Sequence, residues 1–137
     1  MRITAQKKIR VFLGDLAYFN KWSLPMITTP LNVAYVAAYL NKEFGNEVEV
    51  TLFKNPEHLL QEARLNPPDV LGLSCLFWNT RLDIRVFERM RQINPDCLLV
   101  IGGQSIDTDL DQQKNLYQQM NKCVDFMIVN EGELGFS

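Results

Sequence analysis

The sequence has few of the residues that mark metalloproteins, disulfide-rich proteins or membrane proteins. It contains one histidine and three cysteines, and these lack the close spacing of a metal-ligand set. An odd number of cysteines also argues against a disulfide framework. No apolar run approaches the roughly 20 residues that a membrane-spanning helix needs. These absences predict a protein of the reducing cytoplasm, with no metal site of its own and no membrane partner.

An excess of charge of one sign is also absent. Fourteen basic and sixteen acidic residues give a formal net charge of −2, so no nucleic acid is expected as a partner. The length of 137 residues and the hydrophobic content of 47% are those of one globular domain. No linker or low-complexity tract divides the chain. We therefore predict a single domain over residues 1–137.

What the sequence does contain is a regular alternation of predicted strands and helices. Five short apolar segments are predicted as strands, over residues 9–13, 48–52, 70–73, 98–101 and 126–129. The four helices between them are predicted to begin near Pro30, Pro56, Thr80 and Asp109. This alternation indicates an α/β fold with a parallel, doubly wound sheet of the Rossmann or flavodoxin type. The order 2-1-3-4-5 is favoured, because segment 48–52 alternates in polarity and suits an edge strand.

Two of the helix starts carry specific signals. Thr29 is predicted as an N-cap, with Pro30 at the first helical position. Thr80 and Asp83 have the spacing of a capping box, with aspartate in place of the usual glutamate.

The last predicted strand, over residues 126–129, is apolar throughout, although it lies at an edge of the sheet. An exposed apolar edge is an aggregation hazard that natural proteins usually cover. We therefore expect this edge to be covered by a segment beyond Ser137, or to pair in a dimer.

The candidate site lies at the carboxyl ends of the third and fourth predicted strands, where open α/β sheets bind ligands. Ser74, Leu76 and Asn79 follow the third strand, and Gly102-Gly103 ends the fourth. A pair without side chains lets a bulky ligand lie against the backbone, and a serine beside it can hydrogen-bond the same ligand. Valine at Gly103 is expected to block this slot and leave the fold intact, since the position lies in a loop.

Three common occupants of such a fold are excluded by what the loops lack. The first strand is followed by G-D-L-A-Y-F-N, which has neither the G-x-G-x-x-G of a dinucleotide site nor the Ser/Thr-rich phosphate loop of a flavodoxin. A phospho-acceptor receiver domain needs an aspartate where Ser74 stands and a lysine where Asn130 stands.

The remaining motifs resemble those of the cobalamin-binding domain at the N-terminus of B12-dependent radical SAM enzymes. The matching segments are P-L-N-V-A-Y-V-A-A-Y-L, P-D-V-L-G-L-S-C-L-F-W-N, V-I-G-G-Q and V-D-F-M-I-V-N-E-G-E. In that family S-x-L and G-G line the pocket for the nucleotide tail of cobalamin. The resemblance implies this role for Ser74, Leu76, Gly102 and Gly103. The expected cofactor-binding set also includes Asp15, Asn79, Gln104, Glu131 and Gly132.

The family's D-x-H-x-x-G signature after the first strand is not met. Asp15 matches its first position, but Ala17 stands at the histidine position and Asn20 at the glycine position. The resemblance therefore implies cobalamin held base-off, without a histidine ligand to cobalt. His58 is expected to be an ordinary surface residue.

The resemblance also implies a larger parent enzyme, a B12-dependent radical SAM methyltransferase or a related enzyme. Its [4Fe–4S] cluster and S-adenosylmethionine would be bound by a catalytic domain beyond Ser137. No C-x-x-x-C-x-x-C can be built from the three cysteines, so this domain alone is expected to catalyse nothing. Two alternatives stay open. One is a degenerate domain that binds no cobalamin and serves the catalytic domain structurally. The other is an unrelated flavodoxin-like domain for another nucleotide-bearing ligand.

Overall fold

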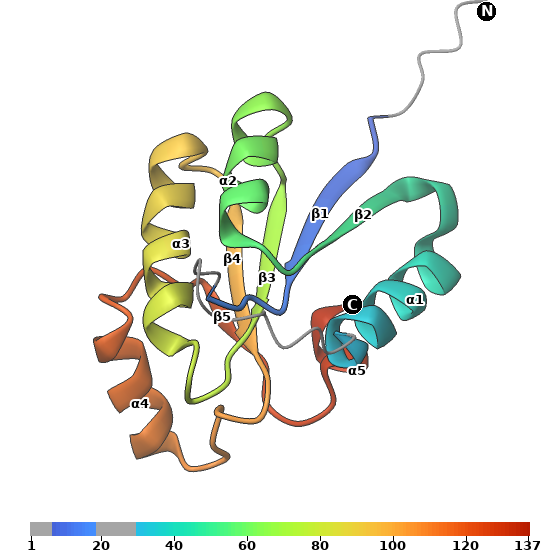
Figure 1. Ribbon diagram of the computed structural model, residues 1–137. Coiled ribbons are helices and arrows are strands. Elements are labelled where there is room, and N and C mark those ends of the chain that lie inside the picture. Colours follow the sequence, from blue (N-terminus) through green and yellow to red (C-terminus); the bar gives the residue numbers. More distant parts are fainter. Residues whose placement is uncertain (1–6, 19–29) are drawn as a thin grey trace, which may run out of the picture.

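The computed structural model describes residues 7–18 and 30–137, which form one parallel sheet with helices on both faces (Figure 1). The strand order is β2-β1-β3-β4-β5, and every neighbouring pair is parallel. The predicted doubly wound sheet and its order are therefore confirmed. The strands are β1 (Ile9–Gly14), β2 (Val48–Phe53), β3 (Val70–Ser74), β4 (Leu98–Gly102) and β5 (Phe126–Met127).

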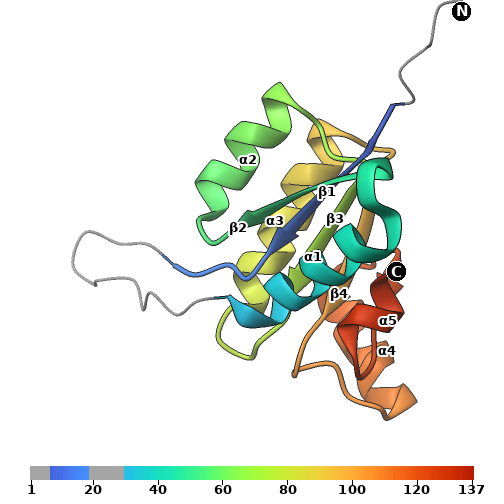
Figure 2. The same ribbon diagram turned by 90° about the vertical axis from the view of Figure 1, so that its right-hand side faces the viewer.

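The helices are divided between the two faces of the sheet (Figure 2). One face is covered by α1 (Leu31–Phe44), with α5 (Gly132–Phe136) beside it. The other face is covered by α2 (Pro56–Leu65) and α3 (Thr80–Ile93), and α4 (Leu110–Gln119) lies next to α3 in the view of Figure 1. A short 3-10 turn, Gly45–Glu47, connects α1 to β2. Within the described ranges, every helix is too short or too polar to cross a membrane.

Each face of the sheet has its own hydrophobic core, which explains the continuous apolar runs in the sequence. In β1, Phe12 packs into the core under α2 and α3, while Val11 and Leu13 pack against α1. Successive side chains of a strand point to opposite faces, so a strand covered on both sides has no exposed position to make polar. The edge strand β2 instead exposes Glu49 and Thr51, as its alternating pattern predicts. Leu52, which the same alternation would bury, is however also exposed.

Two predicted helix starts are wrong in detail. Helix α1 begins at Leu31, with Pro30 as its N-cap rather than its first residue; Thr29 lies outside the described residues. The capping box at Thr80 is wrong, because Asn79 is the N-cap of α3 and its side chain makes no capping bond. Asp83 is fully buried, and neither oxygen of its carboxyl group has a hydrogen-bond partner. The N-caps Asn55 and Asp109 do accept bonds from the first turns of α2 and α4.

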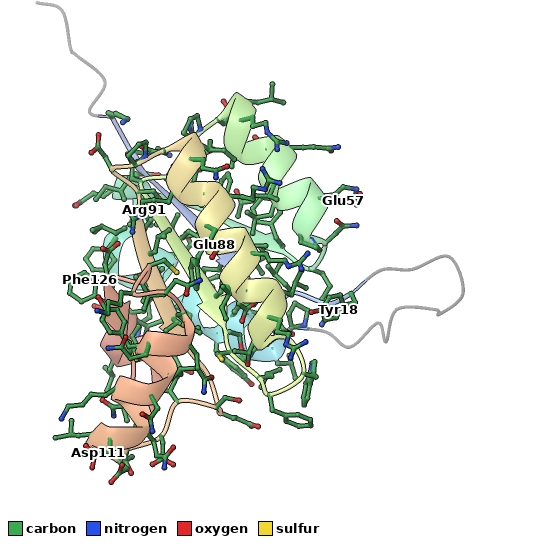
Figure 3. The ribbon with its side chains drawn as sticks, turned by 90° about the vertical axis from the view of Figure 1, so that its left-hand side faces the viewer. Tyr18, Glu57, Glu88, Arg91, Asp111 and Phe126 are labelled. Atoms are coloured by element: carbon green, nitrogen blue, oxygen red, sulfur yellow. The ribbon has the colours of Figure 1, made fainter. Side chains whose placement is uncertain are left out.

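The segment after β4 also differs from its prediction. β5 contains only Phe126 and Met127 rather than residues 126–129. The chain then forms α5, which the sequence pattern did not predict. A Cβ atom added at Gly72 of β3 would lie 2.6 Å from Cε2 of Phe136, so this ring rests against a part of the sheet that has no side chain. Phe126 remains 59% exposed at the sheet edge (Figure 3), and the covering segment or dimer expected there stays a prediction.

Arg91 of α3 ties the amino ends of β4 and β5 together (Figure 3). Its Nη1 donates to the carbonyl oxygens of Pro95 (2.9 Å) and Cys97 (3.0 Å). Its Nη2 donates to the carbonyl oxygen of Cys123 (3.0 Å) and to Oδ2 of Asp125 (3.1 Å). The fork of the guanidinium thus serves four acceptors in fixed directions, which a lysine ammonium cannot reproduce.

We expect Arg91→Lys to lower the free energy of unfolding by about 1–2 kcal/mol, because several hydrogen bonds to a charged group are lost at once. Urea denaturation measures this change. Arg85→Lys, an exposed arginine on the same helix, is the matched control and should change stability by less than about 0.5 kcal/mol. Equal stability of the two variants would show that the Arg91 network contributes nothing beyond an ordinary surface charge.

Candidate functional site

A cavity of about 760 Å³ opens at the carboxyl ends of β1, β3 and β4. The first turn of α1 and the segment from Ile128 to Phe136 complete its walls. The volume lies within the range of about 300–1,000 Å³ that is typical of small-molecule sites. Chain connections leave β1 and β3 in opposite directions along the sheet, so the cavity occupies the switch point where doubly wound folds bind ligands.

Most of the predicted contact residues line this cavity. They are Asp15, Ser74, Leu76, Gly102, Gly103, Gln104, Glu131 and Gly132. Asn79 is placed elsewhere: its side chain is fully buried, and its Oδ1 accepts from the N–H of Leu76 (2.8 Å). Its Nδ2 donates to the carbonyl oxygens of Leu16 and Ser74, both at 3.1 Å. Asn79 therefore fixes the loop after β3, which in turn shapes the cavity wall.

Ser74 lies at the floor of the cavity and is only 5% exposed. Its Oγ accepts a hydrogen bond of 2.6 Å from Nδ2 of Asn32, in the first turn of α1. Asn32 also lines the cavity, and sequence reasoning missed it. The only signal was a polar residue inside the apolar segment P-L-N-V, and nothing local showed that the fold would bring it to Ser74.

The two glycines that end β4 have different constraints. Gly103 has φ +107, and a Cβ atom there would lie 2.7 Å from the oxygen and 2.9 Å from the nitrogen of Cys75. The expectation that valine at Gly103 leaves the fold intact is therefore wrong. A Cβ atom at Gly102 would make only an ordinary contact, 3.6 Å from Cβ of Ile128. Gly102 is thus the position where a side chain can be added into the cavity without a backbone clash.

We expect Gly103→Ala to lower the free energy of unfolding by about 2–3 kcal/mol, because alanine is strained at this φ and collides with Cys75. Gly102→Ala is the matched control and should stay within about 0.5 kcal/mol of the native protein. Urea or thermal denaturation distinguishes the two. Similar stabilities would contradict the close backbone approach at Gly103.

Asp15 lies at the end of β1, on the cavity wall, and is 8% exposed. Its Oδ2 forms an ion pair with Nζ of Lys54 at 3.1 Å. Ala17, at the position where the family signature has histidine, contributes only a methyl side chain. His58 is exposed on α2 and does not line the cavity. Across residues 7–18 and 30–137, no three His, Cys, Asp or Glu side chains gather as a metal site.

Asp83 is a second buried carboxyl group near this end of the sheet. Burial, followed by the negative charge of Asp15, raises its pKa to about 8. The group is therefore mostly protonated at neutral pH.

The raised pKa of Asp83 predicts a loss of stability as the pH rises. The unfolded chain releases this proton near pH 4, whereas the folded protein keeps it up to about pH 8, so the free energy of unfolding should fall across that interval. Asp83→Asn, which has no proton to lose, should remove this part of the decline. Urea denaturation at pH 5 and pH 8.5 measures it, with the exposed Asp96→Asn as control. Equal pH dependence in Asp83→Asn and the native protein would contradict the raised pKa.

A doubly wound parallel sheet with a ligand-sized cavity at its switch point defines an α/β domain of the class that can bind a ligand at the carboxyl ends of its strands. Comparison with known families makes this more specific. The family model described as "B12 binding domain" matches residues 22–137. The chain belongs to this family.

Two curated relatives are methyltransferases. The cobalamin-dependent radical SAM methyltransferase TokK of Streptomyces tokunonensis is 35% identical over 69 residues, which make up 50% of this chain and 10% of TokK. The 2-(S-pantetheinyl)-carbapenam-3-carboxylate methyltransferase of Streptantibioticus cattleyicolor is 32% identical over 74 residues, or 54% of this chain and 10% of that protein. The matched part of the chain therefore spans about a tenth of each relative.

Solved structures show the same fold at low sequence identity. The cobalamin-dependent S-adenosylmethionine radical enzyme OxsB superimposes with a TM-score of 0.63 at 18% identity, over 93% of this chain and 18% of its own. A cobalamin-binding protein from Desulfitobacterium hafniense superimposes with a TM-score of 0.59 at 15% identity, over 92% of this chain and 55% of its own. The CheY-like protein TadZ of Pseudomonas aeruginosa superimposes with a TM-score of 0.58 at 15% identity, over 91% of this chain and 92% of its own. At these identities the likeness concerns the fold alone.

Proposed function

We propose that this chain is the cobalamin-binding module of a cobalamin-dependent radical SAM methyltransferase and that the nucleotide tail of cobalamin occupies the cavity. The observation that carries this proposal is the pairing of Ser74 and Gly102 at neighbouring strand ends, on the wall of a cavity at the switch point. Membership of the B12 binding domain family supports cobalamin as the ligand. The names of the curated relatives support the class of the parent enzyme.

The residues present fit a nucleotide tail, which has a flat base, a ribose and a phosphate. Leu13, Val33 and Val36 give the cavity an apolar wall for the base. Gly102 leaves room beside Ile128, and the Ser74 hydroxyl supplies a hydrogen bond at the floor. A mostly apolar pocket with a few placed polar groups is typical of cofactor sites.

We further propose that cobalamin is bound base-off, with no histidine of this chain on cobalt. Ala17 has no ligating atom in its side chain, and His58 lies on α2 outside the cavity lining. When bound, cobalamin supplies a cobalt centre that carries a methyl group. The part of this chain's residues is to hold and orient the cofactor.

The [4Fe–4S] cluster and S-adenosylmethionine are proposed to belong to a separate catalytic domain of the parent enzyme, which we place in the cytoplasm. Burial raises the pKa of the thiols of Cys75, Cys97 and Cys123, that of Cys97 to about 12. Cys75 and Cys97 are also buried in the hydrophobic core, so neither presents its thiol to a cluster. We propose that the catalytic domain contacts the exposed edge at Phe126, with self-association through this edge as the alternative.

Purified protein incubated with hydroxocobalamin should retain it through gel filtration, with a base-off absorption spectrum. Gly102→Val should bind at least about tenfold more weakly, because the added side chain enters the space proposed for the tail. His58→Ala is the control and should leave both affinity and spectrum unchanged. Circular dichroism checks that each variant is folded.

Colourless protein at high cobalamin concentration would favour the degenerate-domain alternative, which the replacement of histidine by Ala17 motivates. A Gly102→Val variant that binds as tightly as the native protein would show that the tail lies elsewhere.

A further inference from the structure

The side-chain amide of Asn32 has its orientation fixed by its own helix. Its Oδ1 accepts a hydrogen bond of 2.9 Å from the backbone N–H of Val33. Turning the amide over would place its NH₂ group against that N–H, donor against donor, and lose the bond. The NH₂ group therefore faces Ser74, and the bond of 2.6 Å between Nδ2 and Oγ has one direction only: Asn32 donates and Ser74 accepts.

This direction decides what the Ser74 hydroxyl can offer to a ligand. A hydroxyl group has one proton to donate, and Asn32 has no acceptor left on the side that faces Ser74. Among residues 7–18 and 30–137, no other acceptor takes the Ser74 proton. Ser74 is 5% exposed and lines the cavity, so its proton remains for a group inside the cavity. A buried donor without an acceptor is unfavourable, so an acceptor on a ligand would be bound selectively.

We propose that Asn32 is a positioning residue that makes Ser74 an obligate hydrogen-bond donor, so that the cavity selects an unprotonated acceptor in the nucleotide tail. This inference rests on the proposed function, because the tail is the proposed occupant. The acceptor can be a ring nitrogen of the base or an oxygen of the phosphate group. A protonated base, which presents a donor at the same atom, would be rejected for lack of an acceptor.

A purely structural role is the competing explanation, since the bond also links α1 to β3. However, α1 is already held on the sheet by Val33, Ala37 and Leu40, which are buried against β1. The two explanations differ in what a change of polarity at Asn32 should do. An aspartate can still accept from the Val33 N–H, but its second oxygen would take the Ser74 proton away from the ligand.

The test is a double-mutant cycle on cobalamin affinity, measured by isothermal titration calorimetry. Asn32→Asp and Ser74→Ala should each weaken binding on the order of tenfold, through loss of the same hydrogen bond. The double variant should bind no more weakly than Ser74→Ala alone. Asn32→Ala, which leaves the hydroxyl free to rotate toward the ligand, should lose less than Asn32→Asp. Thermal unfolding of each variant verifies its fold.

A cobamide with a phenolic base distinguishes the two acceptors, because it keeps the phosphate but has no ring nitrogen. If Asn32→Asp no longer weakens binding when this cobamide is the ligand, the acceptor is the base nitrogen. If the loss persists with this cobamide and disappears in the Ser74→Ala background, the acceptor is the phosphate; a loss that persists in both backgrounds is charge repulsion by the new carboxylate and contradicts the inference.

Two results would overturn the inference while the proposed function stands. One is native affinity in Asn32→Asp. The other is an equal loss from Asn32→Asp in the native and Ser74→Ala backgrounds, which would mean that Asn32 acts without Ser74. Failure of the native protein to bind cobalamin would instead overturn the proposed function, and this inference with it.

Discussion

The close approach of two backbones at the carboxyl ends of β3 and β4 is the constraint on which the site depends. The N–H of Cys75 donates to the oxygen of Gly102 at 2.6 Å, and the oxygen of Cys75 accepts from the N–H of Ser105 at 3.2 Å. Gly103 makes this possible, because its positive φ turns the chain and no Cβ atom presses on Cys75. The two strands thus stay together past their last paired residues, Ser74 and Gly102, which meet the cavity side by side.

The fold and the position of the cavity were predictable because each follows from local patterns and from one general rule. Apolar runs at β1, β3 and β4 mark strands covered on both faces, and the alternation in β2 marks an edge. The order of the strands then places the switch point between β1 and β3. Ser74 and Gly102 could be chosen as candidates because each lies at the carboxyl end of such a strand, and these ends meet at one edge of a parallel sheet.

The misses share a different cause, since each depends on contacts between distant parts of the chain. Thr80 and Asp83 have capping-box spacing, yet Asp83 is buried instead of capping α3. The segment G-E-L-G-F contains two glycines, which disfavour a helix, yet α5 forms there because Phe136 packs against Gly72, 64 positions earlier in the chain. Packing of this kind overrides intrinsic helix propensity. Asn32 was missed for the same reason, since its partner Ser74 lies on another element.

In the described part of the chain, the charged residues that line the cavity are all acidic, namely Asp15, Glu131 and Glu133. Asp15 is neutralised by Lys54, and the proton-bearing Asp83 lies outside the cavity lining. The polar group at the floor is the neutral hydroxyl of Ser74, whose oxygen accepts a hydrogen bond from Asn32. Beyond the floor, Trp78 lies on the cavity wall and is 57% exposed. Its ring packs edge-on against the ring of Phe77, with the two ring centroids 4.7 Å apart. Such exposed aromatic surface is typical of a binding face. The buried hydroxyl at the floor and the open apolar surface at the mouth suit the proposed module, in which one end of a large cofactor is fixed and its other end stays accessible.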